Sequence, residues 1–144
     1  MKQVFHLKFK ETPPDSRAYI KLFETTGWND DYQVDELGLG TAISNSWFTL
    51  SVYNDENKLV GFGRVVSDGV LYAFICDMIV APDCQNQGIG SKILKKLIRQ
   101  CQEAGIRVLW LFAAADKSGF YQKHGFKNRH HNAPGMQLNL NIKE

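Results

Sequence analysis

The first hydrophobic pattern in the chain is typical of a strand with one buried face. Over residues 4–10, apolar side chains nearly alternate with polar ones. A Pro-Pro break follows, and Asp15 or Ser16 is suited to cap a helix that ends near Gly27. A second short helix is expected over residues 34–43.

Three β-rich runs come next, separated by short segments of turn-forming residues. They cover residues 47–53, 58–66 and 70–80. The segments between them are too short for a crossover connection, so we expect the three strands to pair antiparallel.

After Pro82 the hydrophobic period lengthens from two residues to nearly four. Apolar residues from Ile89 to Cys101 recur at helical spacing, and Gly105 is suited to end the helix. The continuous apolar run over residues 108–113 predicts a strand that is covered on both faces. A strand, a helix and a strand in this order imply a right-handed crossover and one parallel pair.

The remaining chain predicts a short helix and a final strand. The helix covers residues 118–124 and ends at Gly125, and Met136, Leu138 and Leu140 alternate with polar residues in the strand. The predicted fold class is therefore α+β, with a mixed, mostly antiparallel central sheet flanked by helices. No linker or repeat divides the sequence, so we expect one domain over residues 1–144.

Composition narrows the classes of partner. The chain has 144 residues, of which 44% are hydrophobic and 22% charged, and these are ordinary globular values. A net charge of +2 is too small to indicate a nucleic acid or a membrane as partner. The three cysteines form no C-x-x-C pair, the apolar runs are too short for a membrane helix, and no export signal is visible at the N-terminus. We expect a cytoplasmic protein without a metal.

A loop with two glycines leads from the third β-rich run into the long helix. Backbone N–H groups in the first turn of a helix lack an internal acceptor, and glycines let an anion approach them. The loop from Gln85 to Ser91 is therefore a candidate cradle for a diphosphate. The order Gly90-Ser91-Lys92 does not fit a Walker loop, and Ile93 replaces the third glycine of a dinucleotide fingerprint. A simple tight turn is the structural alternative.

Three segments resemble the GNAT superfamily of N-acetyltransferases. Val80-x-Pro82 followed by Gln85-x-x-Gly88-x-Gly90 is similar to its acetyl-CoA motif. Gly61-Phe62-Gly63-Arg64 is similar to the family's third strand, and Phe120-Tyr121 with Gly125-Phe126 to its late helix. The segments follow in the family's order over more than half of the chain. The resemblance implies that the strand ending at Val80 splays from the strand over 108–113, and that acetyl-CoA is the acyl donor.

The resemblance also implies which residues hold acetyl-CoA. The splayed strand would pair with the pantetheine arm, and the amide of Ile79 or Val80 would polarise the thioester carbonyl. The residues expected to contact the cofactor are Met78, Ile79, Val80, Gln85, Asn86, Gln87, Gly88, Ile89, Gly90, Ser91, Lys117 and Tyr121.

Tyr121 matches the position of the family's general acid, which protonates or hydrogen-bonds the departing thiolate. A tyrosine packed in the core beside Phe120 and Phe126 is the alternative. The family's asparagine seven residues earlier is replaced by Ala114, so contacts from Lys117 or Ser118 are expected instead.

The general base has several candidates. Only about one alkylammonium in 10³ is neutral at pH 7, so the amine must lose a proton before it attacks. Asp77 is the carboxylate candidate, with a structural role at a bulge in its strand as an equal alternative. His124 and a chain of water molecules are further alternatives. Cys84 has no histidine at readable spacing, so transfer is expected to be direct, in a ternary complex, without an acyl-cysteine.

The acceptor is expected to be a primary amine of a small molecule. Trp28, Tyr32, Trp47 and Tyr72 are candidates for an aromatic pocket, with acidic residues near 30–36 at its entrance. Core packing and ordinary surface acidity explain the same residues. The predicted function is an acetyl-CoA-dependent N-acetyltransferase, possible as a homodimer. An acyl-CoA-binding module without turnover and a protein that binds another nucleotide remain alternatives.

Overall fold

The computed structural model describes residues 6–141, which fall into two compact units divided after Trp110. The first unit contains the sheet and the long helix, and the second begins at Leu111. A single domain over residues 1–144 stays a prediction.

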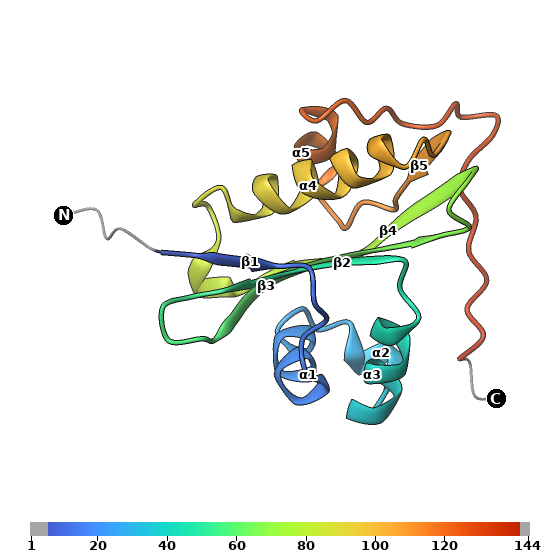
Figure 1. Ribbon diagram of the computed structural model, residues 1–144. Helices are drawn as coiled ribbons and strands as arrows, with labels where there is room; N and C mark the ends of the chain where they lie inside the picture. The colour runs from blue at the N-terminus through green and yellow to red at the C-terminus, as the bar shows by residue number, and fades with distance from the viewer. Residues whose placement is uncertain (1–5, 142–144) are drawn as a thin grey trace. The chain divides into compact units, whose positions relative to one another are not determined.

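A five-stranded sheet forms the centre of the first unit (Figure 1). The strands lie in the order of the chain, and every neighbouring pair is antiparallel except β4 and β5, which are parallel. Their bounds are Lys8–Lys10 for β1, Phe48–Tyr53 for β2, Leu59–Ser67 for β3, Tyr72–Val80 for β4 and Val108–Trp110 for β5. The predicted fold class, a mixed and mostly antiparallel sheet with helices, is confirmed.

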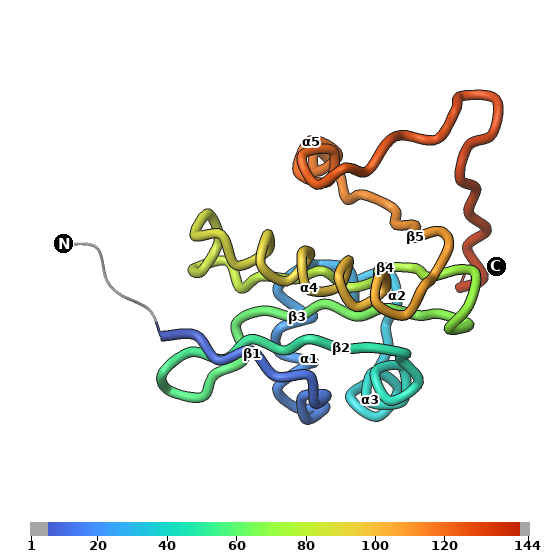
Figure 2. The backbone as a smooth tube through the Cα atoms, turned by 45° about the horizontal axis from the view of Figure 1, so that its top comes forward, coloured from blue at the N-terminus to red at the C-terminus, as the bar shows by residue number. Residues whose placement is uncertain are grey.

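Helices cover both faces of this sheet. Figures 1 and 2 show α1, α2 and α3 on one face and α4 on the other. These helices are Ser16–Glu24, Asn29–Tyr32, Glu36–Ser44 and Ile89–Glu103. The side chain of Asp15 accepts a hydrogen bond from the amide of Ala18 at the start of α1, and Asp35 caps α3 in the same way. The sequence predicted α1, α3 and α4, whereas α2 is an additional single turn.

Alternation along β3 determines how the two helical layers pack on the sheet. Phe62 is fully buried and lies edge-on to the ring of Tyr19 in α1, with 4.7 Å between the ring centroids. Gly61 and Gly63 face the other way, where a Cβ atom on either would lie within 3.2 Å of α4 side chains. The glycines therefore allow α4 to approach the sheet closely.

The last part of the chain differs from the sequence prediction. Strand β5 ends at Trp110 instead of continuing to residue 113, and Val108 and Trp110 are partly exposed. The second unit contains the predicted short helix as α5, Ser118–Gln122. Residues 136–140 form no strand, so that expectation is wrong. Alternating apolar residues become a strand only where a neighbouring backbone supplies hydrogen bonds. The first residues of the predicted N-terminal strand, 4 and 5, lie outside the described residues.

Over residues 6–141, none of the helices combines the length and the apolar character that a membrane crossing requires. Within the same residues, no three His, Cys, Asp or Glu side chains are grouped as metal ligands.

Candidate active site

The loop between β4 and α4 is the candidate anion-binding loop. A single 3₁₀ turn, Pro82–Cys84, leaves the strand, and Gly88 is the N-cap residue of α4. The φ angle of Gly88 is +83°, in the left-handed region that side chains disfavour. A Cβ atom built on Gly88 would meet no atom within 4 Å. The backbone here is therefore accessible, and the glycine is required by its conformation and not by crowding.

The start of α4 directs backbone N–H groups into this loop. No side chain caps α4, so the N–H groups of its first turn are not bound by a capping side chain and the positive end of the helix dipole faces the loop. The side chain of Gln85 turns back and donates to the carbonyl oxygen of Val80 at 3.0 Å, which closes the loop on the end of β4. The predicted residues from Gln85 to Ser91 thus lie together at the N-terminus of a 15-residue helix.

Strand β4 loses its parallel neighbour halfway along its length. Its pairing with β5 covers only Tyr72, Ala73 and Phe74. Among residues 6–110, the described part of the first unit, no strand pairs with residues 75–80 on that side. The predicted cofactor residues Met78, Ile79 and Val80 all belong to this half. A substrate with an extended amide-containing arm can therefore pair with the free edge of β4 and reach the α4 loop with its phosphates.

A β-bulge interrupts β4 at Asp77. Phe62 pairs with Ile79, but Arg64 pairs with Cys76, so two residues of β4 face Gly63 alone. Asp77 has a φ angle of +55°, which is uncommon outside glycine and is best tolerated by Asn and Asp. The bulge turns the Asp77 side chain toward α1 and α3, the helices on the Phe62 face of the sheet.

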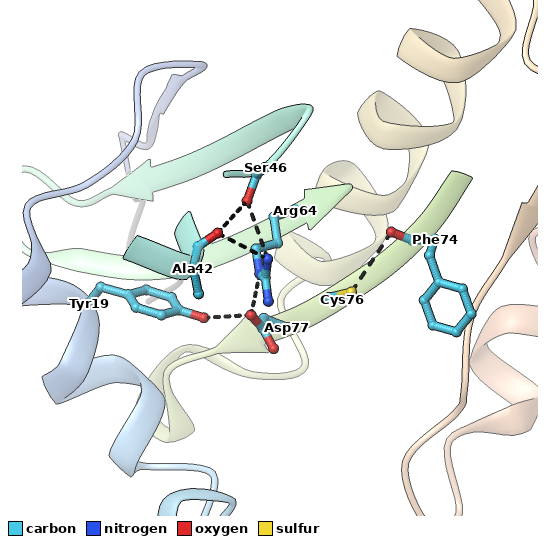
Figure 3. Close-up of polar contacts among 7 residues, drawn as sticks. All are labelled: Tyr19, Ala42, Ser46, Arg64, Phe74, Cys76 and Asp77. Atoms are coloured by element: carbon cyan, nitrogen blue, oxygen red, sulfur yellow. Dashed lines mark hydrogen bonds and ion pairs between the residues drawn. The ribbon is translucent and has the colours of Figure 1, made fainter. Parts of the chain in front are cut away.

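The Asp77 carboxylate is held by two donors on different elements (Figure 3). Arg64 Nε donates to Asp77 Oδ2 at 2.5 Å, and the Tyr19 hydroxyl donates to the same oxygen at 3.0 Å. Arg64 Nη1 also donates to the Ala42 carbonyl oxygen at 3.3 Å and to Ser46 Oγ at 3.4 Å. These contacts join β4, β3, α1 and the C-terminal turn of α3. We call Tyr19, Arg64 and Asp77 the bulge cluster.

Electrostatics keep the two donors of the bulge cluster protonated. Burial raises the pKa of Tyr19, and the negative charge and hydrogen bond of Asp77 raise it further. Burial by itself would lower the pKa of Arg64, but the charge and hydrogen bond of Asp77 outweigh it, so the pKa of Arg64 is raised. The phenol and the guanidinium therefore remain hydrogen-bond donors across the physiological pH range.

The predicted general acid lies in the second unit. Tyr121 belongs to α5 and packs edge-on against the rings of Phe120 and Phe126, with centroid distances of 5.0 and 5.9 Å. Burial raises the pKa of Tyr121, so its hydroxyl stays protonated at neutral pH. Lys117 immediately precedes α5. The roles of Tyr121 and Lys117 at the cofactor stay predictions.

The aromatic residues suggested for an acceptor pocket make separate contacts. Trp28 packs on Phe23 with 5.8 Å between ring centroids, whereas Tyr72 stacks on Trp110 at 5.3 Å. Two of the acidic residues make local structural contacts: Asp35 caps α3, and Glu36 accepts a hydrogen bond from Ser16. These contacts favour the structural interpretation for Trp28, Tyr72, Asp35 and Glu36.

The cysteine in the loop lacks the features of a nucleophile. Burial raises the pKa of Cys84, and the nearby charge of Asp83 raises it further. Its sulfur lies 3.6 Å from a carboxylate oxygen of Asp83. Both effects disfavour the reactive thiolate, and direct transfer without an acyl-cysteine stays a prediction.

Comparisons with known proteins decide the family. A family model described as an acetyltransferase (GNAT) domain matches residues 46–128, which include both β4 and the α4 loop. The chain belongs to the GNAT acetyltransferase family. The resemblance that the three sequence motifs indicated is confirmed.

Relatives and structural neighbours of the GNAT chain agree with this assignment. An uncharacterized N-acetyltransferase of Pyropia yezoensis is 37% identical over 129 residues, covering 83% of this chain and 72% of that protein. A chloroplastic serotonin N-acetyltransferase of Oryza sativa subsp. japonica is 31% identical over 125 residues, covering 85% and 61%. A crystal structure of a probable acetyltransferase from methicillin-resistant Staphylococcus aureus has a TM-score of 0.83 and 24% identity, covering 93% and 99%. The chain spans less than two thirds of the length of several relatives that it matches.

Proposed function

We propose that this GNAT chain transfers the acetyl group of acetyl-CoA to a primary amine. The observation that carries the proposal is the free half of β4 leading into the open glycine loop of α4. The free edge suits the amide-containing arm of CoA, and the loop suits its diphosphate. Acetyl-CoA supplies the activated acyl group as a thioester.

Backbone groups would provide most of the recognition of acetyl-CoA. Amides from Gln85 to Ser91 bind the diphosphate, and the edge of β4 from Met78 to Val80 binds the arm. Of the two predicted amides, that of Val80 points away from β3, because the pairing with β3 directs the N–H groups of Ile79 and Ala81 toward that strand. Aimed at the thioester oxygen, the Val80 amide would stabilise the negative charge that develops on attack. Removing one such donor from an enzyme typically costs about 10²–10³-fold in rate.

Tyr121 would assist the leaving group. Burial raises the pKa of Tyr121, so the phenol would stay protonated and able to donate a hydrogen bond to the CoA thiolate at physiological pH. The incoming ammonium must lose its proton before attack, and Asp77 is the carboxylate candidate for that step. Both described hydrogen bonds to Asp77 end on Oδ2, so any proton acceptance would fall to Oδ1. Asp77 as base remains a hypothesis beside its role at the bulge.

A small-molecule amine is the substrate class that we propose. The rice relative is named for serotonin, which carries a primary amine on a short chain. Cytoplasmic localisation and a homodimer stay predictions.

Thiol release from acetyl-CoA tests the proposed activity. We expect release above the background without acceptor for at least one member of a panel containing serotonin, a polyamine, an amino acid and a lysine peptide. Stimulation by the peptide alone would contradict the small-molecule class. Saturable binding of acetyl-CoA without stimulation by any amine would favour the alternative, an acyl-CoA-binding module.

A further inference from the structure

The bulge in β4 determines the direction of the backbone that follows it. Ile79 is buried and pairs with Phe62, so packing in the core fixes the register beyond the bulge. The register does not fix the orientation of the peptide groups at Asp77, which occupies the left-handed region. Those groups immediately precede Met78, Ile79 and Val80. Because Ile79 and Val80 are already held by their pairing with β3, whatever fixes Asp77 sets the direction of the peptide group that leads into Met78, at the start of the free edge.

Two elements contact the Asp77 side chain directly and a third is linked to it through Arg64, and none of the three contributes to the glycine loop. Tyr19 comes from α1 and is only 1% exposed, and Arg64 comes from β3. The guanidinium also contacts the Ala42 carbonyl oxygen near the C-terminus of α3, where the helix dipole favours a positive charge. Asp77 is thus tied to both long helices on its face of the sheet.

The geometry favours anchoring over proton exchange at Asp77. One carboxylate oxygen accepts from a cation and from a phenol, and neither donor releases its proton near neutral pH. Charge-assisted hydrogen bonds of this kind are among the stronger ones in proteins and restrict the geometry of the side chain. The described contacts thus hold Asp77 in place.

We propose that Tyr19 and Arg64 are positioning residues, which act through Asp77 to orient the backbone at Met78, where the free edge of β4 begins, toward the arm of acetyl-CoA. The inference rests on the proposed use of acetyl-CoA. It assigns a role in cofactor binding to two residues outside the glycine loop, and it makes Asp77 an anchor instead of the general base.

Two ligands separate this role from a general effect on folding. Acetyl-CoA reaches both the free edge of β4 and the glycine loop, whereas 3′-phosphoadenosine 5′-diphosphate is the nucleotide part of CoA and lacks the arm. A variant that misplaces only the edge weakens acetyl-CoA binding and leaves nucleotide binding unchanged. A variant that loosens the whole unit weakens both.

The experiment measures the Kd of both ligands by calorimetry for Tyr19→Phe and Arg64→Lys. Tyr19→Phe removes one hydrogen bond and keeps the aromatic ring. Arg64→Lys keeps the positive charge but loses the planar guanidinium, which donates to several acceptors at once. We expect the acetyl-CoA Kd to rise about threefold for Tyr19→Phe and about tenfold for Arg64→Lys. The nucleotide Kd should stay within about twofold. Tyr53→Phe and Arg107→Lys are the matched controls, which should change neither Kd.

The outcomes separate the inference from the proposed function. If the unsubstituted protein does not bind acetyl-CoA, the proposed function fails and the inference fails with it. If it binds, and the ratio of the two Kd values is the same in the variants, the inference alone is overturned. An equal loss for both ligands also overturns it, because that result indicates only a structural role. If Arg64→Lys does not fold, Tyr19→Phe decides.

The pH dependence of kcat/KM for Asp77→Asn distinguishes a role of Asp77 as an anchor of the backbone from a role as the general base. Asn tolerates the left-handed conformation and its side-chain oxygen accepts both hydrogen bonds, but it cannot take a proton at neutral pH. We expect the acidic limb of kcat/KM to remain at the pH of the unsubstituted enzyme. Loss of that limb would identify Asp77 as the base and overturn the anchor role.

Discussion

Arg64 and Asp77 form an ion pair across β3 and β4, with Arg64 Nε 2.5 Å from Asp77 Oδ2. Their side chains are 16% and 19% exposed, so water screens the pair only partly. The contact connects the last residue of the Gly61–Arg64 motif in β3 with the bulge of β4. The low exposure of these side chains distinguishes the pair from Arg99 and Glu103 on α4, which form an exposed ion pair.

Breaking the pair should destabilise the first unit. Replacing Arg64 by Met leaves the Asp77 charge largely buried without its cation, and such losses typically cost about 3 kcal/mol. Urea unfolding measures the free energy of unfolding. Arg99→Met is the control and should change it by less than about 1 kcal/mol, since exposed pairs contribute little. Equal effects of the two substitutions would contradict the importance of the buried pair.

Tyr19 should make the protein sensitive to alkaline pH. Burial and the neighbouring Asp77 carboxylate raise the pKa of Tyr19 in the folded state above the usual tyrosine value of about 10. The stability that the protonated phenol contributes is therefore fully present below pH 10 and is lost as the pH rises above it. Thermal unfolding from pH 8 to 11 should show a smaller decrease in Tm for Tyr19→Phe than for the unsubstituted protein. If Tm falls equally with pH in the two proteins, the stabilising role of the buried, protonated Tyr19 phenol is wrong.

Gly63→Ala should be destabilising for steric reasons. Its Cβ atom would lie 2.8 Å from Ile93 and 3.0 Å from both Leu97 and Met78. Overpacking of this kind typically costs about 1–3 kcal/mol. Gly119→Ala is the control, because a Cβ atom there meets nothing within 4 Å. If the two variants unfold at the same temperature, the close approach of α4 to β3 is wrong.

Tyr121→Phe should lower kcat and leave the acetyl-CoA Kd nearly unchanged. The substitution removes the proposed hydrogen bond to the leaving thiolate and keeps the packing of the ring against Phe120 and Phe126. We expect a decrease in kcat of about 10²-fold, within the range for a positioned acid. Steady-state kinetics and calorimetry measure the two quantities. Unchanged turnover would remove Tyr121 from the mechanism.

The sequence predicted the parts of the fold that follow from local pattern. The helix cap at Asp15 and the glycine loop before α4 are each determined by a few neighbouring residues, and the structure contains both. The final strand near Leu138 was wrong, because an alternating pattern cannot reveal whether a partner backbone is available. The contact of Tyr19 with Asp77 spans 58 positions. Tyr19 has the spacing of an ordinary core residue, so no local signal distinguished its hydroxyl.

Calorimetric titration of paired glycine variants with acetyl-CoA measures whether the loop around Gly88 binds the diphosphate, as we propose. Gly88 and Gly27 have φ angles of +83° and +80°, and a Cβ atom on either meets nothing within 4 Å. Substitution by Val therefore imposes similar backbone strain at both sites. Only Gly88→Val places a side chain in the proposed phosphate space.

We expect saturable binding of acetyl-CoA to the unsubstituted protein and to Gly27→Val, and a loss of at least about tenfold in affinity for Gly88→Val, or about 1.4 kcal/mol. Equal affinity of the two variants, or no binding to the folded unsubstituted protein, would contradict this expectation.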